Sequence, residues 1–387
     1  MDYKNKFLKI REATRHICEH AKIDEMLLFL AEQLEDEANI NMLIKANKTD
    51  VDKITSDSSQ NIHLKLSHAR IAGIATNIRA VAMDASPLEI VLKSHTYSNG
   101  LEISKISAPL GVVYIVCDAR PDIIFDMFSL CIKAGNACVL KLGDCAKNTA
   151  KVAEKIIKNA LQMFGFDSLL ITLLPNQIEK DVEVTQYVDL VIPLVASGTD
   201  VVHVFYDESA NREQAMAIIN SSKTRHNALD CLLVHRNRLY DLSIVFNPLA
   251  DARITIFADN CSIKALRGRY PADLLMNADE NTYGKNFMLH SMALKTVDDL
   301  EDALKHISRY GSRHCEAIIS NSEENIEIFL NRVDATKLYV NASTSFNVCP
   351  SLGLGAEKDK IHARRPIGIN ELTSYRCIVR GNGQTVD

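Results

Sequence analysis

The run LGVVYIVC at residues 110–117 is the stretch that decides the fold. It is apolar and rich in β-branched residues from end to end, as expected of a strand buried on both faces of a sheet. The segment DIIFDMFSLCIKAG (122–135) has the length of a helix with Gly135 as its stop signal, and ACVLKL (137–142) is a second apolar strand. A strand, a helix and a strand of these lengths predict a βαβ unit in a parallel sheet.

The same alternation extends along most of the chain. Upstream, apolar residues at helical spacing predict helices around residues 26–34 and 71–81, the latter after a cap at Ser67. Downstream, further strands are predicted at 169–175, 188–193, 232–235, 253–258, 292–297, 316–320 and 338–343, and helices lie between many of them. No linker rich in Pro, Gly or Ser separates the halves, so the pattern predicts two α/β domains, of which the second starts near residue 215.

Composition restricts the class of protein. The chain has 387 residues, 47% hydrophobic and 24% charged, with a net charge of −5, which is typical of a soluble globular protein and gives no basic field for nucleic acid. Residues 1–20 are charged throughout and no apolar stretch has the length of a membrane span, so we expect a cytoplasmic protein. The 10 cysteines include no CxxC pair, which favours reduced, mostly buried thiols and no metal site.

Two short segments are candidates for chemistry. The common glycine-rich phosphate fingerprints are absent, but LKLGDCAKNT (140–149) places Lys141 and Gly143 before a helix N-terminus, where a phosphate can bind. An ordinary β–α turn has the same pattern. The segment SSKTRHNALDCLLVH (221–235) concentrates cations, histidines and a cysteine. It indicates either an activated nucleophile or a helix–turn–strand junction with a solvated rim.

A series of segments resembles one known family over nearly the whole chain. In order they are CDARPDIIFDMFSLCIKAGNACVLKLGD (117–144), VDLVIP (188–193), NALDCLLVH (227–235), YGSRHCEAII (310–319), YVNAST (339–344), GLGAE (353–357) and IHARRPIGINELTSY (361–375). Together they resemble γ-glutamyl phosphate reductase (glutamate-5-semialdehyde dehydrogenase), of the aldehyde dehydrogenase superfamily. The resemblance implies the reduction of γ-glutamyl phosphate to glutamate 5-semialdehyde in proline biosynthesis, with NADP(H) as the cofactor.

The resemblance also implies how the chain is divided. The fold would be α/β, with two doubly wound domains of the aldehyde-dehydrogenase type and a small β oligomerisation element. A Rossmann-like cofactor-binding domain would comprise residues 1–97 and 111–214, the catalytic domain 215–365, and the oligomerisation element 98–110 and 366–387. The β-rich tail would add to a partner's sheet edge and give a homodimer or homotetramer. Glutamate 5-kinase is the expected protein partner.

Positions within the family's motifs imply three groups of site residues. The cofactor would contact Lys141, Gly143, Pro193, Ser197 and Gly198. The substrate would contact Arg120, Asn341, Ser343, Thr344, His362 and Arg364. The catalytic group would be His226, at the position of the family's nucleophilic Cys, Asp122, at the position of its oxyanion-binding Asn, and Asn227, with Cys231 as a fallback thiol.

The catalytic positions depart from the family's pattern. His226 is a poorer acyl carrier than a thiolate, and Cys231 stands at the start of a predicted buried strand, which favours a core residue over a displaced nucleophile. The carboxylate of Asp122 accepts hydrogen bonds, whereas the family's Asn amide donates one, so Asp122 would repel an oxyanion. Its negative charge would also raise the pKa of a nearby His226. The segment after Pro193 is short, so much of the cofactor wall is expected to be missing.

Two functions therefore remain open on the sequence. The first is a working NADPH-dependent reductase. The second is a catalytically impaired homologue, with a lost nucleophile and shortened active-site loops, that acts as a binding or structural protein.

Overall fold

The structure, a computed structural model, describes most of the chain. The described residues are 3–15, 17, 20–53, 65–117, 122–143, 146–175, 184–194, 201–224, 229–287, 290–345 and 368–383. They form two compact units, the first made of Met1–Val195, Val348–Asp359 and Pro366–Asp387 and the second of Ala196–Asn347 and Lys360–Arg365. The second unit therefore begins before residue 215, because the strand His203–Tyr206 pairs with strands of that unit.

The first unit is built on a parallel sheet with the order β5-β4-β3-β6. Its strands are β3 (Val112–Cys117), β4 (Ala137–Leu142), β5 (Ile171–Leu174) and β6 (Leu190–Leu194). Helix α6 (Ile123–Lys133) connects β3 to β4, and α7 (Lys147–Met163) connects β4 to β5. The predicted βαβ unit is confirmed, and its strands are buried as their continuous apolar runs require.

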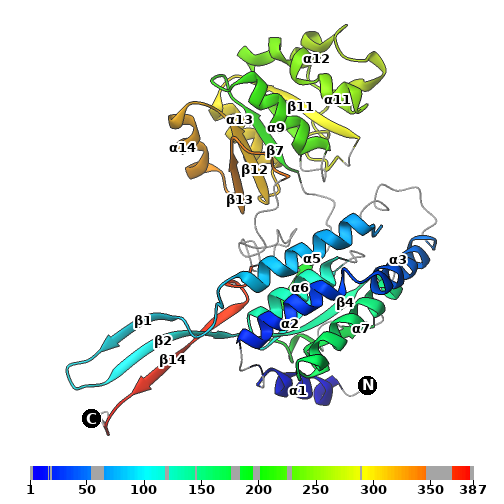
Figure 1. Cartoon of the computed structure of the whole chain (residues 1–387). Helices are drawn as coiled ribbons and strands as arrows, with labels where there is room; N and C mark the ends of the chain where they lie inside the picture. Colours follow the sequence, from blue (N-terminus) through cyan, green and yellow to red (C-terminus); the bar gives the residue numbers. More distant parts are fainter. Residues whose placement is uncertain are drawn as a thin grey trace. The chain divides into compact units, whose positions relative to one another are not determined.

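Helices from the N-terminal part of the chain complete this unit. They are α1 (Tyr3–Thr14), α2 (His20–Gln33), α3 (Glu37–Val51) and α5 (His68–Met83). Helices α2, α3 and α5 pack against α6 and α7 (Figure 1). The Ser67 side chain accepts a hydrogen bond from the Arg70 backbone N–H, which confirms the predicted cap of α5. No helix in the described part of the chain is long and apolar enough to cross a bilayer.

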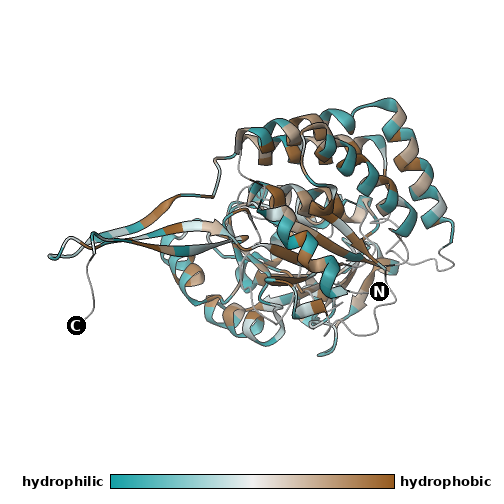
Figure 2. Ribbon diagram, turned by 90° about the horizontal axis from the view of Figure 1, so that it is seen from below, coloured by the Kyte–Doolittle hydropathy of each residue, from teal (hydrophilic) through white to brown (hydrophobic). Residues whose placement is uncertain are grey.

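A three-stranded antiparallel sheet, called the arm below, extends from the first unit (Figures 1 and 2). Its order is β1-β2-β14, with β1 (Val91–Thr96), β2 (Glu102–Pro109) and β14 (Thr373–Arg380). The hairpin thus begins before the expected residue 98. The tail strand β14 pairs with β2 of its own chain, and the expectation that it adds to a partner's sheet edge stays a prediction. Asn136 fixes the start of the tail, because its side-chain amide donates to the Leu372 carbonyl at 2.8 Å.

The second unit holds a seven-stranded parallel sheet with the order β10-β9-β11-β8-β7-β12-β13. The strands are β7 (His203–Tyr206), β8 (Cys231–His235), β9 (Thr255–Ala258), β10 (Leu275–Asn277), β11 (Ser291–Val297), β12 (Cys315–Ile319) and β13 (Lys337–Val340). Each strand is parallel to its neighbours, as predicted.

Helices cover both faces of this sheet, which makes the unit doubly wound (Figure 1). One face carries α9 (Arg212–Thr224), α10 (Leu242–Val245), α11 (Asn247–Asp251) and α12 (Asn260–Leu266). The other carries α13 (Leu300–Tyr310) and α14 (Glu323–Arg332). The fold class predicted from the sequence, α/β with two doubly wound parts and a small β element, is confirmed.

Candidate active site

The predicted cofactor residues of the first unit lie at one edge of its sheet. Val116 of β3 pairs with Lys141 of β4 on one side and with Pro193 of β6 on the other, so these residues share one rung. Gly143 follows β4 directly. This is the carboxyl edge of a parallel sheet, beside the strand at which the order reverses, where ligands of such sheets bind.

The helix that follows this edge already holds an anion. Asp50 of α3 is 2% exposed, and its carboxylate accepts hydrogen bonds from the backbone N–H groups of Asn148 at 3.1 Å and Thr149 at 2.8 Å. The Gly143 N–H donates to the Cys117 carbonyl at 3.1 Å. These N–H groups therefore serve the fold, and a phosphate at this edge would depend on the Lys141 ammonium.

Asp122 does not present an isolated carboxylate. It stands at the N-terminus of α6, and its Oδ2 atom lies 2.9 Å from Nη2 of Arg70 on α5. The guanidinium and the positive end of the helix dipole both compensate its charge. The repulsion that the sequence suggested is therefore weaker than an unpaired carboxylate would give. Arg70 was missed because it is separated from Asp122 by 52 positions and has no local signal.

Two buried charged residues, Lys223 and Asp230, flank the segment of the sequence that contains the candidate nucleophile. Lys223 is in the last turn of α9, and its ammonium donates to the carbonyls of Leu229 at 3.1 Å and Phe287 at 3.2 Å. Burial lowers the pKa of Lys223, although Asp230 attracts the charged form. Lys223 thus ties the end of α9 to the start of β8.

Asp230 completes this anchor from the other side. Its carboxylate accepts hydrogen bonds from the N–H groups of Val202 at 3.1 Å and Phe287 at 2.7 Å. Burial raises the pKa of Asp230, while Lys223 opposes the rise. Asp230 belongs to the charged segment 221–235 of the sequence, where nothing local assigned it a role.

The described substrate candidates separate into two arrangements. Ser343 Oγ lies 2.9 Å from Ser222 Oγ on α9, and the Thr344 N–H donates to the same oxygen at 3.2 Å. Ser222 directly precedes Lys223 in α9. Ser343 and Thr344 therefore lie close to the end of α9 that leads to the candidate nucleophile in the sequence. Asn341 is used elsewhere: its amide accepts from the Ser320 N–H at 3.0 Å and donates to the Ser320 carbonyl at 2.8 Å.

Cys231 is the first residue of β8 and has no exposed surface. Burial raises the pKa of its thiol, against the opposing effect of His203. A buried, protonated thiol is a poor nucleophile. The geometry supports the interpretation of Cys231 as a core residue.

Several predicted site residues lie outside the described part of the chain. They are Arg120, Ser197, Gly198, His226, Asn227, His362 and Arg364. Their assignments stay predictions from the resemblance.

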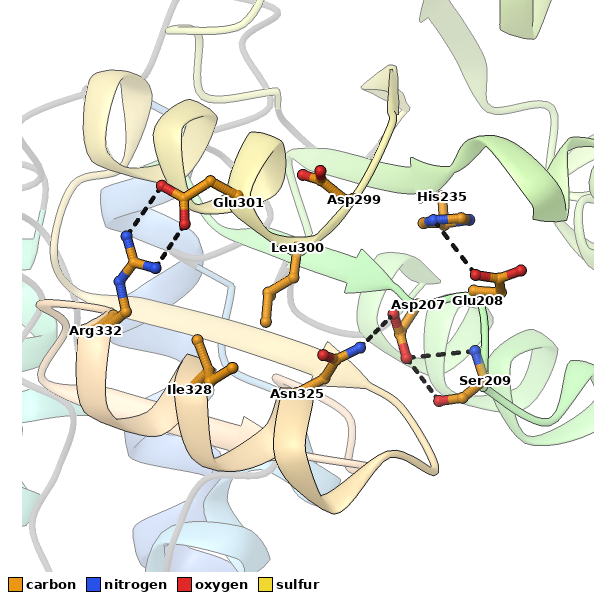
Figure 3. Close-up of a pocket in the computed structure, with 10 residues that line it drawn as sticks. All are labelled: Asp207, Glu208, Ser209, His235, Asp299, Leu300, Glu301, Asn325, Ile328 and Arg332. Carbon is orange, nitrogen blue, oxygen red and sulfur yellow. Dashed lines mark hydrogen bonds and ion pairs between the residues drawn. The ribbon is translucent and has the colours of Figure 1, made fainter.

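A separate pocket opens at the carboxyl ends of β7 and β8 (Figure 3). Its volume is about 530 Å³, and its lining residues are Asp207, Glu208, Ser209, His235, Asp299, Leu300, Glu301, Asn325, Ile328 and Arg332. No predicted site residue lines it. Burial would raise the pKa of Asp207, but hydrogen bonds from Ser209, Ser320 and Asn325 lower it below its usual value. Arg332 is paired with Glu301 at 2.5 Å, so the charges of this pocket are largely satisfied internally.

Comparisons with known proteins agree with the fold and cover the whole chain. No family model matches the chain. It is 37% identical to the γ-glutamyl phosphate reductase of Bacteroides fragilis over an alignment 415 positions long, with 100% of each chain covered. The crystal structure of γ-glutamyl phosphate reductase from Thermotoga maritima is similar with a TM-score of 0.83 and 25% identity, also with 100% of each chain covered. An acetylating aldehyde dehydrogenase from Geobacillus thermoglucosidasius shares the fold, with a TM-score of 0.70, 16% identity and coverage of 99% and 97%.

Proposed function

Because the chain belongs to the γ-glutamyl phosphate reductase family, we propose that it reduces γ-glutamyl phosphate to glutamate 5-semialdehyde with release of phosphate. The observation that carries the proposal is likeness over the full length, at 37% identity with 100% of each chain covered. Each of the two units holds a parallel sheet, which is consistent with the proposed cofactor-binding and catalytic domains. The reaction would belong to proline biosynthesis, and we expect the protein to be cytoplasmic.

NADPH is the proposed cofactor, and it would supply the hydride. The carboxyl edge formed by β4, β3 and β6 fits a dinucleotide in its position at the strand reversal, and Lys141 is the residue that would hold a phosphate or ribose hydroxyl. The N-terminus of α7 offers a phosphate less than a free helix end would, because Asp50 already accepts from the Asn148 and Thr149 N–H groups. Binding should therefore be weak.

His226 is the proposed nucleophile, and it limits the rate. A neutral imidazole can attack an acyl phosphate, but the acyl-imidazole that forms is a reactive acyl donor that water readily cleaves. Productive turnover thus needs a site that excludes water. The buried hydrogen bonds of Lys223 and Asp230 support this role, because they hold the end of α9 and the start of β8, the described residues on either side of His226 in the sequence.

A second candidate function rests on the same position. If His226 supports no acyl transfer, the chain is a catalytically impaired homologue that binds a metabolite or a partner. The replacement of the family's Cys by His226 and of its Asn by Asp122 favours this candidate.

A steady-state assay separates the two candidates. The purified chain is given glutamate 5-semialdehyde, phosphate and NADP⁺, and NADPH formation is followed by its absorbance. Slow but saturable formation of NADPH supports the reductase. Binding of NADP⁺ without any turnover supports the impaired homologue.

The arm is the proposed site of self-association. We expect a homodimer or homotetramer, because the outer edges of β1 and β14 have no paired strand among the described residues. Glutamate 5-kinase, which would make the unstable acyl phosphate, is the proposed protein partner.

A further inference from the structure

A cluster of four polar side chains is buried inside the second unit, away from any exposed surface. His203, Cys231 and Glu316 come from three adjacent strands and share a rung, because His203 pairs with Cys231 on one side and with Glu316 on the other. His306 reaches the same point from α13, which covers this face of the sheet. The exposed fractions are 0% for His203 and Cys231, 1% for Glu316 and 9% for His306.

The donor atoms of this cluster converge at distances that suit one metal ion. The Cys231 sulfur and one donor nitrogen from each of His203 and His306 all lie within 4.8 Å of one another. The Cys231 Sγ atom is 3.8 Å from Nε2 of His306. A tetrahedral zinc ion with ordinary Zn–S and Zn–N bonds would separate such atoms by about 3.6 Å. The three donor atoms would bind one ion if the longer distances between them shortened toward this value.

His203 supplies the second observation that points to a ligand. Its Nδ1 atom lies 3.1 Å from Oε2 of Glu316, which leaves Nε2 for another partner. That Nε2 atom is buried and has no hydrogen-bond partner among the residues that the structure describes. An unsatisfied buried polar atom is costly and needs an explanation. Metal-bound histidines characteristically give their other ring nitrogen to a carboxylate, as His203 does with Glu316.

From this geometry we propose that the second unit binds one Zn²⁺ ion through Cys231 Sγ, His203 Nε2 and His306 Nε2, with Glu316 orienting His203. Two imidazoles and a thiolate are ligands that zinc prefers, and a bound water would complete the four-coordinate site. The doubly charged ion, the thiolate and the carboxylate together are neutral, which removes the main penalty for burying them. On binding, the metal replaces the thiol proton of Cys231 and the proton that a charged His203 carries on Nε2, and both protons leave to solvent.

The proposed site would connect β7, β8, β12 and α13. Its ligand Cys231 is the residue that follows Asp230. The absence of close cysteine pairs predicted no metal site, whereas these ligands are spread from residue 203 to residue 306. The site is independent of the proposed reduction, since no ligand contacts the candidate substrate residues in any described hydrogen bond.

Cobalt titration of the full chain tests the proposal without an activity assay. The protein is treated with chelator under reducing conditions and titrated with Co²⁺, whose bond to a thiolate gives a charge-transfer absorption band. We expect the band to saturate at one equivalent, Zn²⁺ to abolish it by displacement, and Zn²⁺ to raise the unfolding temperature. Absence of a thiolate band in the unmodified chain would overturn the proposal.

Three variants assign the ligands. Cys231→Ser should lose the band, and Glu316→Gln should keep it but weaken Co²⁺ binding about 10–100-fold, as expected for a group behind a ligand. Cys315→Ser is the matched control, because Cys315 is a buried cysteine of β12 that faces the opposite side of the same sheet. If Cys231→Ser does not fold, His306→Gln replaces it and should weaken Co²⁺ binding while the thiolate band remains. A band that survives Cys231→Ser, Co²⁺ affinity that is unchanged in His306→Gln, or a band that disappears in Cys315→Ser would overturn the proposed ligand set.

Discussion

Asp50 is the residue that determines what the first turn of α7 can bind. Asp50→Ala should lower the free energy of unfolding by about 2 kcal/mol, because buried N–H groups of Asn148 and Thr149 lose their acceptor. Asp50→Asn should cost less, since an amide oxygen can still accept. Urea unfolding followed by circular dichroism measures both.

Asp52→Ala is the control for this prediction, because Asp52 is exposed and no described side-chain hydrogen bond involves it. It should change stability by less than about 0.5 kcal/mol. Equal unfolding midpoints for Asp50→Ala and Asp52→Ala would show that the Asp50 cap does not stabilise the unit.

Sequence patterns predicted the apolar residues better than the polar contacts. The strand at 110–117 and the cap at Ser67 follow from local rules of burial and capping, and the structure confirms both. The pairs Arg70–Asp122 and Asp50–Thr149 join residues 52 and 99 positions apart. No periodicity encodes such a contact, so the electrostatics of the candidate site could not be derived from the sequence.

At the level of elements, the arm should mediate self-association. All residues of β1 are exposed, and Val379 of β14 is 58% exposed on an outer strand. Val379→Lys should weaken the dimer, because charges on an edge strand oppose pairing with a second chain. Light scattering at micromolar concentration measures the change.

Met163→Lys is the matched control for the arm, since Met163 is a 73% exposed apolar residue at the end of α7. It should leave the mass unchanged. A monomer in the unmodified chain would contradict the role of the arm outright.

The carboxyl edge of the first sheet makes a separate prediction about the cofactor. NADP(H) should bind in the micromolar range or more weakly, because β6 ends at Leu194, β7 follows from His203, and the N–H groups of α7 are taken by Asp50. Calorimetric titration should show a further loss in Lys141→Ala. Lys155→Ala, an exposed lysine of α7, should bind as the unmodified chain does. Submicromolar affinity, or no effect of Lys141→Ala, would contradict this prediction.

Elements were predictable where they were long and regular. Helices α13 and α14 follow the predicted segments, whereas the short helices α10, α11 and α12 were not predicted, because four to seven residues hold too little periodicity. The edge strand β1 was also missed. It is exposed on every residue, so it lacks the alternation that marks a half-buried strand.

At the scale of the whole molecule, the two α/β units follow from the sequence but their boundary does not. The segment HVFY at 203–206 reads as a buried strand that either sheet could accept. Its assignment to the second unit depends on pairing with β8 and β12, which are distant in sequence. The same limitation hid the His203–Cys231–His306 cluster, which exists only once the strands are in register.

The central claim is that this chain is a reductase of its family whose rate is limited by His226. The direct test is NADP⁺ reduction with glutamate 5-semialdehyde and phosphate, measured for the unmodified chain, His226→Cys and Cys231→Ser. We predict that His226→Cys is faster by about tenfold or more, because a thioester outlasts an acyl-imidazole, and that metal-free Cys231→Ser, if folded, matches the metal-free unmodified chain. A chain whose activity is abolished by Cys231→Ser without unfolding, and is not raised by His226→Cys, would contradict the account.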